Sequence, residues 1–295
     1  MSFLSDRVAK NGPELYALFT GGLPAFVTAR HPQPLDQAIP VFCYHVVTHE
    51  AFERDMQFLA ANHYTTVAAD ELLGWMQRKN TLPPNTVTLT FDDGADNFHR
   101  IAFPLLMQYH QKAILFIAPG LHRTAAEEPY QTQRPCTWEE LDEMHASGLV
   151  DIQSHTWEHR SLQHWPTPLP LTGITAEHIH ERRQEPLDMQ ADILLARQTL
   201  EQRFSKPIHH LAWPCYYSDP EAIEIARNNG YTGLWTGTLP RLPLITPGHD
   251  PHQIVRLSGE FLRRLPGSQR ESLYSVLKTR YKRALPNLRR GKKTP

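Results

Sequence analysis

Short apolar runs alternate with longer helix-like stretches along most of this 295-residue chain, and that alternation strongly constrains its fold. The strand-like runs cover residues 40–46, 86–91, 113–118, 149–153, 208–213, 231–236 and 253–257. Helix-like stretches cover 50–62, 68–78, 96–111, 137–147, 187–204, 219–229 and 269–283. Strands that alternate with helices predict a parallel sheet with helical crossovers. The sequence therefore predicts an α/β fold, although the number of strands alone does not show whether the sheet closes into a barrel.

The run at 86–91 ends on two adjacent carboxylates. Apolar residues alternate with threonines along it, which is typical of a strand, and Asp92 and Asp93 follow directly. Gly94 then allows a sharp turn of the chain. An Asp-Asp-Gly sequence alone is more often only a turn. In α/β folds, however, active sites are built at the carboxyl ends of parallel strands, so both aspartates are candidate functional residues.

A second pair of polar residues, His155 and His159, follows the strand-like run at 149–153. Two histidines four residues apart also arise by chance in a chain that contains 17 of them. Histidines at this spacing lie on one face of a helical turn, so both rings can reach a single ion. Together with a carboxylate they form a three-ligand set that leaves positions open for water, which is typical of a catalytic metal site.

These motifs resemble those of the polysaccharide deacetylases, also called the NodB-homology or carbohydrate esterase 4 group. The resemblance extends over residues 41–258, and the two specific motifs are TFDDG at 90–94 and the His-Thr-x-x-His motif at 155–159. Less specific similarities indicate the poly-β-1,6-N-acetylglucosamine deacetylase branch: the segment at 42–47, the helix at 52–59, the segment at 104–117 and Trp213-Pro214. The resemblance implies a distorted (β/α)7 barrel that forms a single catalytic domain.

The resemblance also implies a role for each motif residue. Asp93, His155 and His159 would hold one divalent ion, with zinc the default from the ligand types and cobalt or nickel as substitutes. Asp92 would be the general base that takes a proton from the water activated by that ion. An alternative is that Asp92 only orients a ligand. The implied reaction is the removal of N-acetyl groups from a glycan that contains N-acetylglucosamine.

The general acid is harder to assign. Most members of the family carry a late Leu-x-His motif for this step, and the chain lacks it. The branch that it resembles uses a histidine after the first strand, a position that His45 fits. The alternatives are that His45 is a hydrogen-bonded core residue and that His249 or His252 supplies the proton.

The substrate side of the site also departs from the family pattern. The segment at 213–216 lacks the usual arginine and carries Cys215 where a tyrosine is usual. A backbone amide at Cys215 or Tyr216 could still stabilise the oxyanion, since a backbone donor does not depend on the side chain. Arg256 is expected either to replace the arginine in space or to be a surface ion-pair residue. Trp213 could stack on a sugar, although a tryptophan here is more often a core residue.

The motifs also bear on three alternatives to a deacetylase. Adjacent strand residues point to opposite faces, so Asp92 and Asp93 are not expected to act as the facing carboxylates of a glycosidase. A non-catalytic carbohydrate-binding protein of the same fold remains open because of the altered 213–216 segment. A metal-dependent amidohydrolase that acts on a non-sugar amide also remains open.

Composition and organisation add weaker expectations. We expect an N-terminal extension at 1–39, a catalytic domain at 40–265 and a C-terminal helix with a basic tail at 266–295. The net charge of −1 gives no electrostatic footprint for nucleic acid, although the basic tail could contact an anionic surface. Three widely spaced cysteines favour a reducing compartment, and we expect a cytoplasmic or membrane-peripheral protein, with an extracytoplasmic location as the alternative. The proline-rich segment after His159 is expected to form a lid or a wall of the substrate groove.

Overall fold

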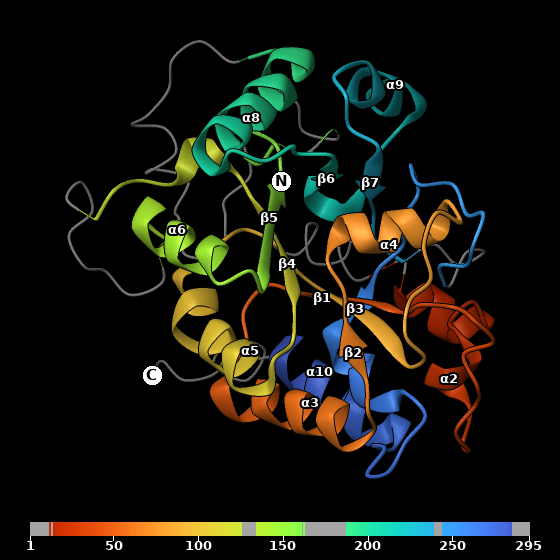
Figure 1. The fold of residues 1–295 in the computed structure, drawn as a ribbon. Coiled ribbons are helices and arrows are strands. Elements are labelled where there is room, and N and C mark those ends of the chain that lie inside the picture. Colours follow the sequence, from red (N-terminus) through yellow and green to blue (C-terminus); the bar gives the residue numbers. More distant parts are fainter. Residues whose placement is uncertain are drawn as a thin grey trace, which may run out of the picture.

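The computed structural model describes residue 12 and residues 14–125, 134–160, 162, 187–238 and 244–284. Its centre is a curled parallel sheet (Figure 1) with the strand order β7-β6-β5-β4-β3-β1-β8. A short additional strand, β2, pairs with β3 outside this order. The strands are β1 (Val41–Tyr44), β2 (Thr65–Thr66), β3 (Thr86–Phe91), β4 (Ala113–Ile117), β5 (Val150–Ser154), β6 (His210–Ala212), β7 (Gly233–Trp235) and β8 (Leu257–Ser258). The predicted parallel α/β fold is confirmed.

The two edges of this sheet approach each other. Trp235 of β7 forms a parallel bridge with Ile254, which lies three residues before β8. The Ile254 amide donates to the Leu234 carbonyl at 2.9 Å, and the Thr236 amide donates to the Ile254 carbonyl at 2.9 Å. This contact gives the sheet the form of a distorted barrel, as the resemblance implied. The predicted strand at 253–257 is much shorter in the structure, because residues 253–256 make only this isolated bridge.

Helices surround the sheet on its outer face. The α-helices include α2 (Ala25–Thr28), α3 (His49–Ala61), α4 (Ala69–Met76), α5 (Phe103–Tyr109), α6 (Trp138–Ala146), α8 (Met189–Phe204), α9 (Pro220–Asn228) and α10 (Leu273–Ala284). Shorter helical segments are η1 (Phe98–Ala102), η2 (Pro119–Leu121), η4 (Pro214–Tyr216) and η5 (Gly259–Arg264). The predicted helix at 96–111 is divided into the π-helical η1 and α5. The predicted start of α9 is confirmed, since the Asp219 side chain accepts from the Ala222 amide at 2.8 Å.

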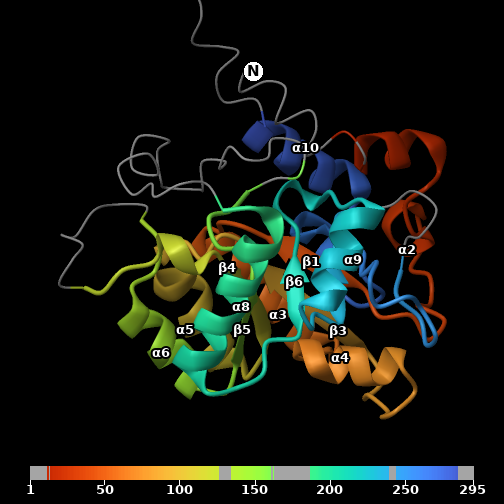
Figure 2. The same cartoon turned by 90° about the horizontal axis from the view of Figure 1, so that it is seen from above.

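Alternate residues of the strands belong to two separate hydrophobic clusters. One cluster contains Phe42, Leu115 and Leu211 together with apolar residues of the surrounding helices. The other contains their strand neighbours, such as Val41 and Phe116, and residues of α4. The first cluster therefore fills the space between sheet and helices, and the second fills the inside of the barrel. Helix α4 covers one end of the barrel, opposite the end where α10 lies (Figure 2).

The described part of the predicted N-terminal extension packs on the body of the protein. Phe26 and Val27 belong to the outer hydrophobic cluster, and the Arg264 side chain donates to the Val27 carbonyl at 2.8 Å. The division at 1–39, 40–265 and 266–295 stays a prediction. The proposed lid and nearly all of the basic tail lie outside the described residues. None of the helices within the described ranges is long and apolar enough to cross a membrane.

Candidate metal centre

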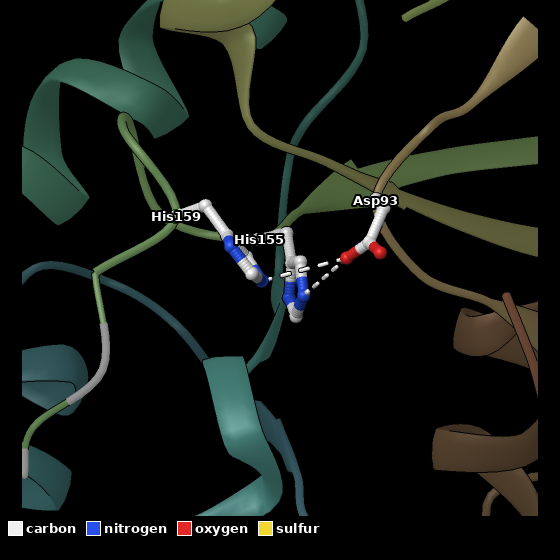
Figure 3. Close-up of side chains that lie close together, drawn as sticks. All are labelled: Asp93, His155 and His159. Atoms are coloured by element: carbon white, nitrogen blue, oxygen red, sulfur yellow. Dashed lines mark ion pairs between the residues drawn. The ribbon is translucent and has the colours of Figure 1, made fainter. Parts of the chain in front are cut away.

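Asp93, His155 and His159 converge at one point (Figure 3). Asp93 Oδ1 lies 3.6 Å from His155 Nε2 and 3.4 Å from His159 Nε2. Each residue offers one ligand atom, and these three atoms all lie within 4.8 Å of one another. Tetrahedral ligands placed about 2.0–2.2 Å from a zinc ion are about 3.4 Å apart. The three side chains are buried and their spacing therefore fits one divalent ion.

The backbone at the end of β3 turns Asp93 into the site. Asp93 and Gly94 both have left-handed conformations, with φ of 76° and 67°. A Cβ atom on residue 94 would lie 2.7 Å from both His122 Cε1 and Ile117 Cγ2, so the position requires glycine. The strand ends at Phe91, and the rule of alternating faces does not apply beyond it. The argument against a glycosidase from opposite faces was therefore wrong.

The two histidines come together on a loop and not on the predicted helical turn. Thr156 and His159 have φ of 67° and 54°, which a right-handed helix does not contain. The Arg160 amide donates to Thr156 Oγ1 at 3.2 Å and closes the bend. The ring centroids of His155 and His159 are 4.9 Å apart. The spacing of four residues thus correctly predicted that the rings of His155 and His159 lie close together, but the predicted helical turn was wrong.

The tautomer of His155 suits a metal ligand. His155 Nδ1 lies 2.7 Å from the Ala212 carbonyl oxygen, an acceptor, so the Nδ1 atom carries the proton. The lone pair of Nε2 then faces Asp93. Metal-binding histidines usually donate their second N–H to such an acceptor, which fixes the ring and raises its basicity.

Asp192 of α8 holds the loop that carries both histidines, and sequence reasoning missed it. Its Oδ1 accepts from the Trp157 amide at 2.8 Å, while the Trp157 carbonyl accepts from the Gly120 amide at 3.0 Å. Asp192 is fully buried, and burial raises its pKa to about 7. The sequence contained a sign of this role. Asp192 precedes the buried Ala196 and Leu200 at four-residue spacing, so it is a carboxylate on an otherwise apolar face of the helix.

Replacing Asp192 with alanine should weaken zinc binding by about 10- to 100-fold, the usual cost of losing a partner behind a metal ligand. The Trp157 amide would lose its acceptor, and the loop between the histidines would gain freedom. Asp192→Asn keeps an acceptor oxygen and should restore most of the affinity. Competition with a coloured zinc chelator measures both variants.

The matched control for this experiment is Asp188→Ala. Asp188 caps the same helix by accepting from the Ala191 amide at 2.7 Å, and it makes no hydrogen bond or ion pair with the described part of the loop. Loss of the cap should lower stability by about 1 kcal/mol and leave zinc affinity unchanged. Equal zinc affinity in wild type and Asp192→Ala would show that Asp192 does not position the loop.

Asp92 lies beside the three candidate ligands in a buried ion pair. Its Oδ1 accepts from Arg256 Nη1 at 2.6 Å, and its Oδ2 lies 3.6 Å from Cys43 Sγ and 4.0 Å from His45 Nε2. Burial would raise the pKa of Asp92, but the charge of Arg256, followed by His155 and His45, lowers it to about 2. Arg256 is 2 % exposed, so the interpretation as a surface ion-pair residue was wrong.

His45 follows β1 at the same rim of the barrel. Its Nε2 atom lies 3.5 Å from the Tyr216 hydroxyl oxygen, and its side chain is 18 % exposed. The two alternative histidines, His249 and His252, precede β8 and therefore lie near the amino ends of the parallel strands. They are at the opposite rim, so the structure contradicts a role for either in this site.

The segment at 213–216 differs from the prediction in part. Trp213 is 1 % exposed and belongs to the outer hydrophobic cluster, so the core interpretation is confirmed and the sugar platform was wrong. The Tyr216 amide already donates to the Trp213 carbonyl at 2.9 Å, which weakens its candidacy as oxyanion donor. Cys215 as the donor stays a prediction. The Tyr216 ring lies against Arg256, with the guanidinium carbon 5.2 Å from its centroid.

The chain is similar to known proteins in sequence and in fold. Residues 79–234 match the sequence profile described as polysaccharide deacetylase. A poly-beta-1,6-N-acetyl-D-glucosamine N-deacetylase from Staphylococcus epidermidis is 23 % identical over 211 residues, which are 72 % of this chain and 67 % of that protein. A Bacillus subtilis relative, named as a polysaccharide deacetylase, is 23 % identical over 65 % of this chain, and the match spans only 62 % of that protein. The structure of IcaB from Ammonifex degensii has a TM-score of 0.59 and 22 % identity, and the alignment covers 77 % of this chain and 93 % of IcaB.

Proposed function

The chain belongs to the polysaccharide deacetylase family, and we propose that it removes N-acetyl groups from a glycan containing N-acetylglucosamine with the help of one divalent ion. The observation that carries the proposal is the convergence of Asp93, His155 and His159 next to the buried Asp92–Arg256 pair. The substrate class is taken from the names of the relatives. Hydrolysis of an amide needs an activated water, a stabilised oxyanion and a proton for the leaving amine, and each has a candidate among the described residues.

A divalent ion held by the three ligands would lower the pKa of a water molecule and polarise the acetyl carbonyl. Arg256 binds Oδ1 of Asp92 and thereby orients the carboxylate, so that Oδ2 is the oxygen that would accept the proton. A carboxylate with a pKa of about 2 is a weak base. It would suffice here because a bound ion would lower the pKa of the water from which Asp92 takes the proton.

His45 is proposed as the proton donor to the leaving amine. Its Nε2 atom lies 4.0 Å from Asp92 Oδ2 and 3.5 Å from the Tyr216 hydroxyl, so two polar groups orient the ring. The ring is partly exposed, which gives a substrate nitrogen access to it. Cys43 Sγ lies 3.6 Å from Asp92 Oδ2 and 3.7 Å from the Tyr216 hydroxyl, so Cys43 and Tyr216 pack next to the same carboxylate.

Replacing His45 with alanine should keep the fold and the full metal content and lower kcat by about 10² to 10⁴, the range for losing a positioned acid. A general acid governs the alkaline limb of the pH–rate profile, because it must be protonated to act. The variant should therefore lose that limb. Acetate release between pH 6 and 10 measures both effects, and an unchanged alkaline limb would take the role away from His45.

The test of the proposed function is acetate release from β-1,4- and β-1,6-linked N-acetylglucosamine oligomers by the zinc-, cobalt- or nickel-loaded protein. We expect release from at least one series and none after chelation. A protein that binds the oligomers and an ion but releases no acetate would be a non-catalytic relative. Release only from non-sugar amides would indicate the amidohydrolase alternative.

A further inference from the structure

A second cavity of about 910 Å³ lies close to the metal loop and is not part of the metal centre. It is formed between α6 and α8, which both pack against β5 (Figure 1), and we call it the α6–α8 groove. The residues that line it include Gly120, Trp138, Asp142, Trp157, Thr199 and Arg203. Its volume is in the range of ligand-binding sites in proteins.

The side chains of the α6–α8 groove are of the kinds that recognise sugars. Two half-buried indoles, Trp138 and Trp157, line it, and indoles present apolar faces and edges to sugar rings. The Arg203 and Asp142 side chains are paired through two hydrogen bonds and are 38 % and 46 % exposed. The Arg203 guanidinium carbon also lies 5.3 Å from the centroid of the Trp138 ring, so Trp157 and the exposed parts of the Asp142–Arg203 pair are the groups that a sugar would meet in the groove.

The groove also lies within reach of the metal centre. Trp157 is two residues from each candidate ligand histidine, and successive Cα atoms are 3.8 Å apart, so its Cα lies within about 7.6 Å of theirs. Its indole packs directly on Gly120, since a Cβ atom at that position would lie 2.8 Å from Trp157 Cε2 and Nε1. The same loop therefore forms the metal centre and one wall of the α6–α8 groove.

From these observations we propose that the α6–α8 groove binds a further segment of the glycan chain whose acetyl group is hydrolysed at the metal centre. The inference rests on the proposed function for the identity of the ligand. Binding at two places on one polymer makes the second contact intramolecular, which raises the affinity for long chains over short ones. A dimer that occupies only the metal centre gains nothing from the groove.

The variant Thr199→Tyr tests this inference, since it fills the groove without removing a packed indole. Isothermal titration with a zinc-loaded full chain gives the Kd of an N-acetylglucosamine hexamer and of a dimer, in both the β-1,4 and the β-1,6 series. We expect the hexamer to bind about threefold to tenfold more weakly to the variant, and the dimer equally. Gln198→Tyr, one residue away on an exposed position outside the groove, should bind both like wild type.

One further control and two outcomes separate the groove from the proposed function. Trp75→Ala, in the cavity at the α4 end of the barrel, should not change the preference for the hexamer. Equal Kd values for the hexamer in wild type and Thr199→Tyr would refute glycan binding in the α6–α8 groove, whether or not acetate is released. A wild-type preference for the hexamer that Thr199→Tyr reduces, without any acetate release, would support glycan binding in the groove and refute the proposed activity.

Discussion

Replacing Asp93 with asparagine, or His155 with alanine, is expected to remove the ion and to lower acetate release far more than the roughly 10- to 100-fold typical of the residues behind a metal ligand. Both side chains are buried and offer their ligand atoms to one point, 3.6 Å apart. Two remaining ligands hold a divalent ion much more weakly than three. Elemental analysis after dialysis, together with acetate release, measures the two effects.

His252→Ala is the matched control for the loss of a histidine. His252 lies at the opposite rim and pairs with Asp250 at 2.9 Å, so both the metal content and the rate should stay at wild-type values. Unchanged metal stoichiometry in both Asp93→Asn and His155→Ala would refute the ligand set.

The second large effect is expected for Asp92→Asn, which should keep the metal and lose turnover by about 10²-fold or more, the scale of a lost general base. The substitution also leaves Arg256 buried without its counter-charge. Removing one partner of a buried ion pair costs about 3–5 kcal/mol, so the Tm should fall as well. The loss of rate must therefore be measured at a temperature where the variant is folded.

A double variant separates the catalytic loss from the loss of stability. Asp92→Asn combined with Arg256→Gln removes both charges and should recover much of the Tm while turnover stays low. Recovery of turnover together with the Tm would mean that Asp92 is only structural. If Asp92→Asn releases the metal and Asp93→Asn does not, the roles of ligand and base are reversed.

The sequence predicted the strand-and-helix order and the convergence of an aspartate pair with two histidines from local patterns, whereas the choice of Asp93 as ligand and Asp92 as base came from the family resemblance and stays a prediction. The alternation in 86–91 indicated a strand, and the position of Asp93 after it indicated the rim of the sheet. The spacing of His155 and His159 indicated that their rings could meet. The strand period and the rule that parallel strands end at one rim account for these predictions, although the two histidines meet on a loop and not on a helical turn.

The features that the sequence did not predict depend on contacts between residues far apart in the chain. Barrel closure needs the bridge between Trp235 and Ile254, which no local pattern encodes. The hydrogen bond from the Trp157 amide to Asp192 joins a loop to a helix 35 residues away. Left-handed backbone at Asp93 and Thr156 invalidated arguments that assumed regular strands and helical turns.

The most direct test of the metal centre is the anomalous difference map of a crystal grown or soaked with zinc. The account predicts one strong peak about 2.0–2.2 Å from Asp93 Oδ1, His155 Nε2 and His159 Nε2, with Asp92 outside the first coordination sphere. A peak that is ligated by Asp92 in place of Asp93, or no peak at this position in a crystal with excess zinc, would contradict it.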